Sequence, residues 1–191
     1  MTTARQGRPP RYSEDELLAV VTGVFIERGY DATSMEDLAR ATGLAKSAVY
    51  HHVTGKEELL RRGVARALEA LFAVLSEPAG DRAVDRLEHV VRRSVDVLVE
   101  ELPYVTLLLR VRGNTEAERW ALARRRTFDR RLTALVQAAI DEGDVRDDLD
   151  PALVTRLLFG MVNSVVEWYR PGGRSVADAL VALVFDGLRR Q

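Results

Sequence analysis

The chain has 191 residues, 47% of them hydrophobic, and a formal net charge of −1 at pH 7. This length suffices for one domain, or for a small module joined to a larger one. The sequence contains no cysteine, which excludes disulfides, thiolate metal sites and cysteine nucleophiles and favours a reducing compartment. No apolar run is long and uncharged enough to span a bilayer, and no apolar segment follows the first arginines, so we expect a soluble, cytoplasmic protein.

The first predicted helix covers residues 14–28. Its apolar side chains recur at helical spacing on one face, and the pattern stops at Gly29, a residue that readily terminates helices. The residues on this face are Leu17, Val21, Val24 and Phe25.

Three more helices are predicted before residue 76. Ser34 and Asp37 have the spacing of a capping box for a short second helix that ends near Gly43. Residues 45–53 predict a short third helix. Thr54 and Glu57 predict a capping box for a fourth helix that runs from about residue 55 to 75. Two short helices separated by a glycine-containing turn form a helix-turn-helix pattern.

The rest of the chain predicts a larger helical domain. Pro103 separates the first two of its helices, Asp150 and Pro151 have the residue types of a helix start, and Ser175 with Asp178 predicts another capping box. The predicted helices span residues 82–101, 104–111, 115–142, 150–169 and 175–188. With no strand pattern and no internal repeat, the sequence predicts an all-α fold of about nine helices.

The stretch LAKSAVYHHVTGKEELL, residues 44–60, contains both lysines of the chain and two adjacent histidines. At 3.6 residues per turn, Lys46, Ser47, Tyr50 and His51 share one face of the third predicted helix, while Val49 lies on another. A helix with such a face fits the DNA major groove, where these side chains bind phosphates and base edges. From charge alone, a solvated surface explains the stretch equally well.

Neither a metal site nor a catalytic site is predicted in this stretch. His51 and His52 point about 100° apart on a helix, whereas two metal ligands on one helix need a spacing of three or four residues. Catalysis by a histidine also needs an orienting or nucleophilic partner, and the stretch has no carboxylate before Glu57.

The segment TSMEDLARATGLAKSAVYHHVTGKEELL resembles the helix-turn-helix of TetR-family transcriptional regulators. The similarity extends over about residues 12 to 60. Ala45 departs from the family pattern because it stands where serine is usual, which removes a capping oxygen worth about 1 kcal/mol; Val53 departs too, replacing a phenylalanine. The matching positions are Thr33, Ser34, Leu38, Ala39, Gly43, Leu44, Tyr50, His51, His52, Lys56, Glu57 and Leu59.

The resemblance implies a DNA-binding domain at residues 1–55 and an effector-binding and dimerisation domain at residues 56–191. A two-fold dimer implies a palindromic operator, with one recognition helix in each half-site. The resemblance implies no enzyme activity, no cofactor and no metal. The DNA contacts that it implies are Thr33, Ser34, Lys46, Ser47, Tyr50, His51 and Lys56, with Arg5, Arg8 or Arg11 of the N-terminal arm entering the minor groove.

The last two predicted helices are apolar around much of their circumference, which favours pairing with a second copy. Gly160 would let another helix approach closely. Packing inside a single chain is the alternative. The interface residues that we expect are Leu157, Gly160, Met161, Ser164, Trp168, Leu180 and Val184.

The effector site is expected among aromatic and polar residues of the larger domain. The segment GMVNSVVEWYRPGGRSV is similar to TetR-family regulators that respond to acyl-CoA thioesters, which implies a hydrophobic effector and CoA phosphates near Arg110 or Arg119. Asn163 has an alternative role in a hydrogen bond between helices. A DNA-binding architectural protein without an effector remains the other candidate. The expected lining residues are Tyr104, Arg110, Arg119, Trp120, Phe128 and Asn163.

Overall fold

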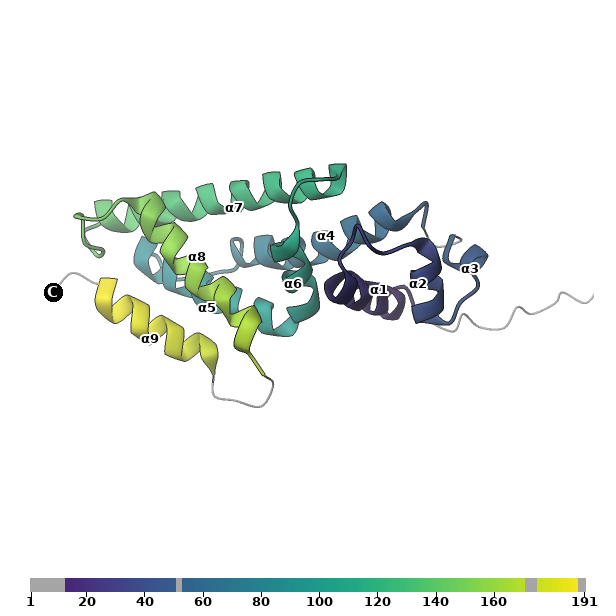
Figure 1. Cartoon of the computed structure of the whole chain (residues 1–191). Coiled ribbons are helices and arrows are strands. Elements are labelled where there is room, and N and C mark those ends of the chain that lie inside the picture. Colours follow the sequence, from purple (N-terminus) through teal and green to yellow (C-terminus); the bar gives the residue numbers. More distant parts are fainter. Residues whose placement is uncertain (1–12, 51–52, 171–174, 189–191) are drawn as a thin grey trace, which may run out of the picture.

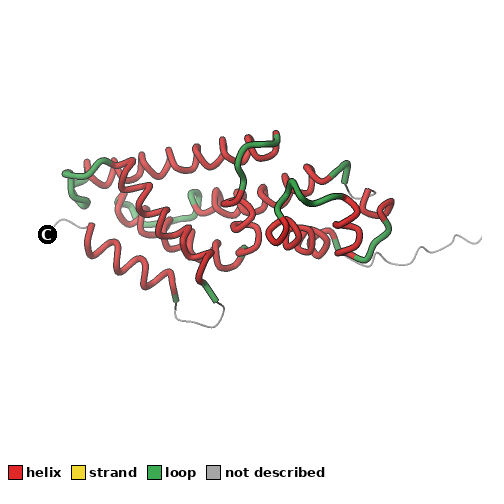
Figure 2. Tube along the Cα trace, viewed as in Figure 1, coloured by secondary structure: helices red, strands yellow, loops and turns green. Residues whose placement is uncertain are grey.

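The computed structural model describes residues 13–50, 53–170 and 175–188, and over these ranges the chain forms nine α-helices and no strand (Figure 2). The predicted all-α fold is confirmed. The helices are α1 (Glu14–Arg28), α2 (Met35–Thr42), α3 (Lys46–Tyr50), α4 (Lys56–Val74), α5 (Ala83–Glu100), α6 (Leu102–Arg110), α7 (Glu116–Asp141), α8 (Pro151–Trp168) and α9 (Val176–Leu188).

The molecule is elongated, with α1, α2 and α3 at one end and α8 and α9 toward the other (Figure 1). Helix α4 connects the two ends, because it packs against α1 as well as against α5, α6 and α7. Helix α6 also packs against α1. The small N-terminal end is therefore held by two helices that belong to the rest of the chain.

Local capping explains where the first helices begin and end. The Ser13 side chain and the Glu16 side chain form a capping box at α1, which the sequence reading missed. The predicted box of Ser34 and Asp37 is present at α2. Gly43 ends α2 in the left-handed conformation, with φ of 64°, where a side chain would be strained.

Two predicted helix starts were wrong in detail. Thr54 does not form a capping box with Glu57; instead its backbone N–H and its hydroxyl donate to Glu58, at 2.6 and 2.9 Å. Glu57 accepts a bond of 2.9 Å from the backbone N–H of Ala117, at the start of α7. Helix α6 begins at Leu102, before Pro103, because proline is tolerated in the first helical turn.

A single apolar cluster runs through both ends of the molecule. It includes Phe25 of α1, Leu60 of α4 and Leu98 of α5, each at most 2% exposed. Burying a leucine side chain contributes roughly 1.5–3 kcal/mol. Because α4 supplies buried residues along its whole length, a displacement of α4 would change the packing at both ends of the molecule.

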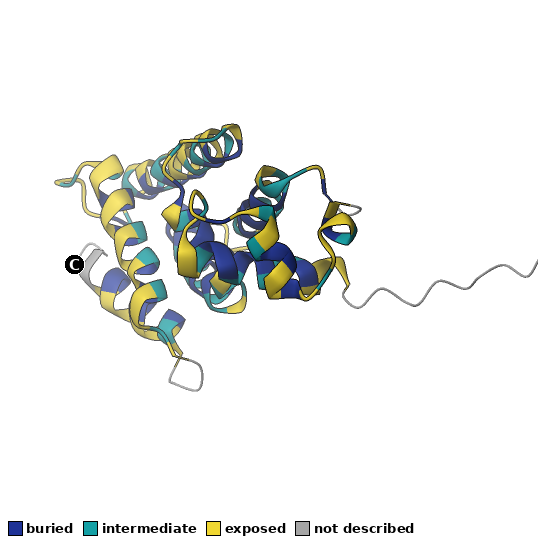
Figure 3. Ribbon diagram, turned by 45° about the vertical axis from the view of Figure 1, so that its right-hand side comes forward, coloured by how far each residue is buried: buried dark blue, intermediate teal, exposed yellow. Residues whose placement is uncertain are grey.

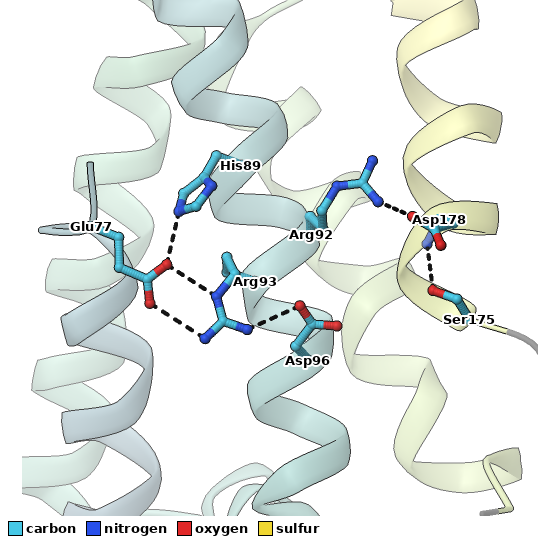
Figure 4. Close-up of polar contacts among 7 residues, drawn as sticks. All are labelled: Glu77, His89, Arg92, Arg93, Asp96, Ser175 and Asp178. Atoms are coloured by element: carbon cyan, nitrogen blue, oxygen red, sulfur yellow. Dashed lines mark hydrogen bonds and ion pairs between the residues drawn. The ribbon is translucent and has the colours of Figure 1, made fainter. Parts of the chain in front are cut away.

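Polar contacts fasten α5 to its neighbours (Figure 4). Glu77, in the loop after α4, accepts a bond of 3.0 Å from Arg93 Nε, and His89 Nε2 lies 2.8 Å from the same oxygen. On α5, the Arg92 guanidinium pairs with Asp178 of α9. The Asp178 backbone N–H donates to Ser175 Oγ at 3.2 Å, which is one of the two bonds of the predicted capping box.

Nowhere in the described ranges does a helix combine the length and apolarity needed to cross a membrane.

Candidate DNA-binding surface and ligand cavity

Helices α2 and α3 are joined by a tight turn at Gly43. The Gly43 N–H donates to the carbonyls of Ala39 and Arg40, and the Leu44 N–H donates to Ala39 O at 3.1 Å. Val49, fully buried, anchors α3 to the core. This anchoring fixes the direction of α3 and leaves its other face exposed.

The exposed face of α3 carries three of the predicted DNA contacts. Lys46, Ser47 and Tyr50 are all exposed, Tyr50 to 47%. Lys46 Nζ donates to Glu36 Oε1 of α2 at 2.9 Å, and this hydrogen bond raises the pKa of Lys46. Ser34 is exposed as well, but its hydroxyl is hydrogen-bonded to Asp37 at 2.6 Å.

Thr33 and Lys56 are placed differently from what the sequence implied. Thr33 is 1% exposed, and its hydroxyl donates to Gly29 O at 2.7 Å. Lys56 Nζ donates to the carbonyls of Tyr30 and Thr33, both at 3.0 Å, and lies 4.3 Å from the centre of the Tyr30 ring. These two residues hold the loop before α2 and do not point outward with the α3 face. His51, Arg5, Arg8 and Arg11 lie outside the described residues.

Much of the outer face of α8 is exposed (Figure 3), and apolar residues form a strip along it. Leu157 is 59% exposed and Trp168 is 55% exposed, and Gly160, Met161 and Ser164 are exposed between them. The sequence reading missed Leu153 on the same helix, which is 45% exposed.

Helix α9 places the remaining expected interface residues in the core. Leu180 and Val184 are at most 9% exposed, because α9 packs against α5 of the same chain. Within the single chain they therefore do not belong to the exposed strip. Leu183, 75% exposed, is the apolar residue that α9 presents to solvent.

A small cavity lies among α4, α5, α6, α7 and α8. Its volume is about 40 Å³, whereas ligand pockets occupy about 300–1,000 Å³, so a ligand must enlarge it. The rings of Phe128 and Phe159 form part of its wall and pack edge to face, with centroids 5.5 Å apart. The lining residues are Leu68, Leu71, Ser94, Leu98, Val105, Leu108, Leu109, Arg125, Phe128, Asp129, Phe159, Val162 and Asn163.

Of the expected effector residues, only Phe128 and Asn163 line this cavity. The Tyr104 ring packs under the Arg66 guanidinium at 4.5 Å, and the Trp120 ring packs under Arg61 at the same distance. Arg110 donates to Ile26 O of α1, and Arg119 donates to the carbonyls of Gly113 and Asn114. The structure therefore does not bring the expected residues together around this cavity, because four of them make contacts elsewhere.

Three polar residues of the cavity were missed by the sequence reading. Ser94 is fully buried on α5, and Arg125 and Asp129 lie one turn apart on α7. Removal from water raises the pKa of Asp129, and the nearby Arg125 charge lowers it. The sequence feature that could have indicated a polar group in the core is Ser94 itself, a serine among the valines of residues 90–97.

Among the residues with described positions, no three His, Asp or Glu side chains gather as they would around a metal ion.

The sequence matches known families at both ends. Residues 17–62 match "Bacterial regulatory proteins, tetR family", and residues 80–191 match "Tetracyclin repressor-like, C-terminal domain". The HTH-type transcriptional repressor KstR2 of Rhodococcus jostii is 30% identical over 98% of this chain and 94% of its own length.

Two solved structures extend the likeness to three dimensions. SCO3833 of Streptomyces coelicolor, a TetR-family member, shares 59% identity at a TM-score of 0.88, with 97% of each chain covered. The ketosteroid transcriptional regulator KstR2 of Mycobacterium tuberculosis shares 25% identity at a TM-score of 0.85, over 98% of this chain and all of that one. The chain therefore belongs to the TetR family of bacterial transcriptional regulators.

Proposed function

We propose that the chain is a homodimeric transcriptional repressor that binds a palindromic operator and is released by a small hydrophobic effector. The observation that carries this proposal is the exposed face of α3, where Lys46, Ser47 and Tyr50 stand on a helix anchored by the buried Val49. The relative in Rhodococcus jostii is named a repressor, which supports repression over activation.

The chemistry of the α3 face suits the major groove. An ammonium group binds phosphates or guanine edges, a hydroxyl bonds to phosphate or bases, and a tyrosine ring contacts a thymine methyl. We assign these roles to Lys46, Ser47 and Tyr50, with His51 following on the sequence. Thr33 and Lys56 are assigned to supporting the loop before α2, because their polar groups are engaged inside the domain.

The apolar strip on α8 supports a dimer. Exposed leucine and tryptophan side chains along one helix lose contact with water when a second copy covers them. A two-fold axis through this strip presents two α3 helices, which explains why the operator is expected to be palindromic.

The cavity supports a hydrophobic effector, and we favour an acyl-CoA thioester. Its wall is mostly leucine, valine and phenylalanine, which suits an acyl group. Arg125 of α7 offers a guanidinium at the cavity for the phosphates of CoA, in place of Arg110 and Arg119.

Helix α4 is the connection between the cavity and the DNA-binding end. Leu68 and Leu71 line the cavity, and Leu59 and Leu60 are buried near α1 on the same helix. The domain boundary that we place near residue 55 lies at the start of this helix. An effector that enlarges the cavity shifts α4 and changes the spacing of the two α3 helices. The equilibrium between the DNA-binding state and the released state shifts by no more than the effector's difference in affinity for the two states.

The test is a selection of randomised duplex DNA on the purified protein, followed by titrations of the selected site at several salt concentrations. The wild type should select a palindrome and prefer it to scrambled DNA by about 1,000-fold or more. Tyr50→Ala should lose this preference with an unchanged melting temperature and dimer content, because Tyr50 is half exposed and makes no core contact that folding requires.

Salt-sensitive binding without sequence preference would contradict the proposal, because phosphate contacts alone give that behaviour. A collapse of folding in Tyr50→Ala would show that Tyr50 is structural. A control variant, Gln137→Ala at an exposed site of α7, should keep the preference for the selected site.

A further inference from the structure

Within the described helices, two buried hydroxyl groups lack a hydrogen-bond partner, those of Thr22 and Ser94, and of the two Ser94 is the one that lines the cavity. Thr42, Thr106 and Thr155 each donate to the carbonyl four residues earlier, at 2.9, 2.7 and 2.9 Å, which is the usual arrangement for such residues. Ser94 is 0% exposed, yet across the described ranges its hydroxyl has no hydrogen-bond partner. Its hydroxyl is therefore unsatisfied where water does not reach it.

The Ser94 hydroxyl borders the cavity. The other lining residues on α4 and α5 are Leu68, Leu71 and Leu98, which offer no polar atom on their side chains. A buried hydroxyl without a partner destabilises the fold, so its presence in a ligand cavity calls for a partner that the protein itself does not supply.

The polar residues of the cavity are arranged by depth. Arg125 on α7 and Asn163 on α8 are half-buried and Asp129 on α7 is partly exposed, whereas Ser94 is completely buried. The cavity thus runs from a charged opening on α7 to a neutral hydroxyl on α5. A ligand that follows this path carries its charge at the opening and an uncharged polar atom inside.

We infer that Ser94 is a specificity-determining residue, which hydrogen-bonds a carbonyl or hydroxyl oxygen on the apolar part of the effector. This inference rests on the proposed function, in which the cavity binds the effector. A carboxylate at Ser94 is disfavoured by its desolvation, because the cationic side chain among the lining residues, Arg125, lies on α7 and is partly exposed. The favoured effector is therefore an oxygenated acyl group and not a plain saturated chain.

The experiment compares decanoyl-CoA with 5-oxodecanoyl-CoA, 7-oxodecanoyl-CoA and 9-oxodecanoyl-CoA, three isomers that differ in the position of the ketone. Binding is measured by calorimetry on the full-length protein. The variants are Ser94→Ala and, as the matched control, Thr106→Val, which removes a hydroxyl that is already bonded inside α6. Ser94→Ala should weaken binding of at least one oxo isomer by about three- to ten-fold, as expected for one neutral hydrogen bond. It should leave decanoyl-CoA binding unchanged, and Thr106→Val should leave the preference between isomers unchanged.

The melting temperature of Ser94→Ala should not fall, because the substitution removes a polar group that has no partner. Equal effects of Ser94→Ala on decanoyl-CoA and on every oxo isomer would overturn the role of Ser94 while leaving acyl-CoA binding intact.

If none of the four thioesters binds the wild type, the acyl-CoA class in the proposed function is wrong. Ser94 is then tested alone with cyclohexanone and methylenecyclohexane, which have nearly the same shape but differ in the oxygen, by ligand-observed NMR. A cyclohexanone signal that weakens selectively in Ser94→Ala supports the inference, and the same change for both probes overturns it.

Discussion

At the scale of single residues, the α3 face is less positive than its sequence indicates. Residues 38–56 contain no acid, but Glu36 of α2 reaches Lys46 at 2.9 Å. Both side chains are at least half exposed, so the pair contributes little to stability. Its effect falls on DNA binding, because Glu36 competes with phosphates for the same ammonium group.

Replacing Glu36 tests this competition. Glu36→Gln should bind the selected operator more tightly, with a dissociation constant lower by roughly two- to five-fold at low salt, and the gain should shrink as salt screens the charges. Fluorescence anisotropy across a salt series measures it. Glu69→Gln, the same change at an exposed site of α4, is the control, and an equal gain there would show that only net charge matters.

The residue scale also shows what the sequence can and cannot predict. Helical spacing correctly placed Lys46, Ser47 and Tyr50 on an exposed face and Val49 in the core, because these positions depend only on the period of the helix. The bond from Lys46 to Glu36 joins two helices across a turn. Spacing within one helix carries no information about such a pair.

At the scale of the helices, α4 packs closely against α1 and α6 at the position of Gly63. A Cβ added at Gly63 would lie 3.0 Å from Leu107 Cδ2 of α6 and 3.3 Å from Thr22 Oγ1 of α1. Leu107 is itself 4% exposed and has little room to move. Gly63 therefore lets α1, α4 and α6 meet closely at the junction between the two ends of the molecule.

Two glycine substitutions test this junction against a matched site. Gly23→Ala in α1, where an added Cβ meets nothing within 4 Å, should raise the free energy of unfolding by about 0.5–1 kcal/mol through helix propensity. Gly63→Ala should lower it by about 1 kcal/mol, because overpacking outweighs the same propensity gain. Urea unfolding measures both, and equal stabilisation at the two sites would refute a tight junction.

The loop after α4 makes stability depend on pH. The hydrogen bond from Arg93, together with the neighbouring His89, lowers the pKa of Glu77 (Figure 4). A lowered pKa in the folded state gives stability that is present above the ordinary glutamate pKa of about 4.3 and is lost as the pH falls through the folded value.

Glu77→Gln should therefore lower the free energy of unfolding by about 1 kcal/mol at pH 7, a figure that allows for the partial exposure of the pair. The difference from wild type should stay constant down to about pH 5 and should narrow as the pH falls below about 4.3 toward the lowered pKa of Glu77. Denaturant unfolding at several pH values follows this change. A constant difference at every pH would mean that the carboxylate charge of Glu77 is irrelevant and that only its packing counts.

Which acid caps a helix depended on where its neighbour pairs. Ser34 with Asp37 formed the expected box, and the adjacent Glu36 pairs with Lys46 of α3 instead. Thr54 had Glu57 and Glu58 in reach, and the bond went to Glu58 because Glu57 pairs with α7. The choice between neighbouring acids was decided by the tertiary fold, which local sequence does not contain.

At the scale of the whole molecule, the proposed interface between two copies is the exposed strip of α8. Leu157→Glu should raise the dimer dissociation constant by about 100-fold or more, because the two-fold axis brings two unpaired carboxylates into one apolar interface. The monomer should stay folded, since Leu157 is 59% exposed within a single chain. Sedimentation equilibrium measures the change, with Ala123→Glu on α7 as the control; an unchanged dimer would place the interface elsewhere.

The effector site was the part that the sequence predicted least well. Aromatic and arginine residues such as Trp120 and Arg110 are typical of pockets, but here they stack and bond at the junction between the ends of the molecule. Phe128 and Asn163 line the cavity together with Ser94, which stands far from both in sequence. Only the crossing of α5, α7 and α8 brings these three residues together.

If the cavity is the effector site, as we propose, its small size also sets how sensitively the protein responds. The effector must enlarge a cavity whose wall includes the packed rings of Phe128 and Phe159, and the apparent affinity falls in proportion to the rarity of the opened state. The dose–response curve is thus governed by core packing as well as by ligand contacts. A relative with smaller side chains at these two positions would respond at lower effector concentrations and would have a less stable fold.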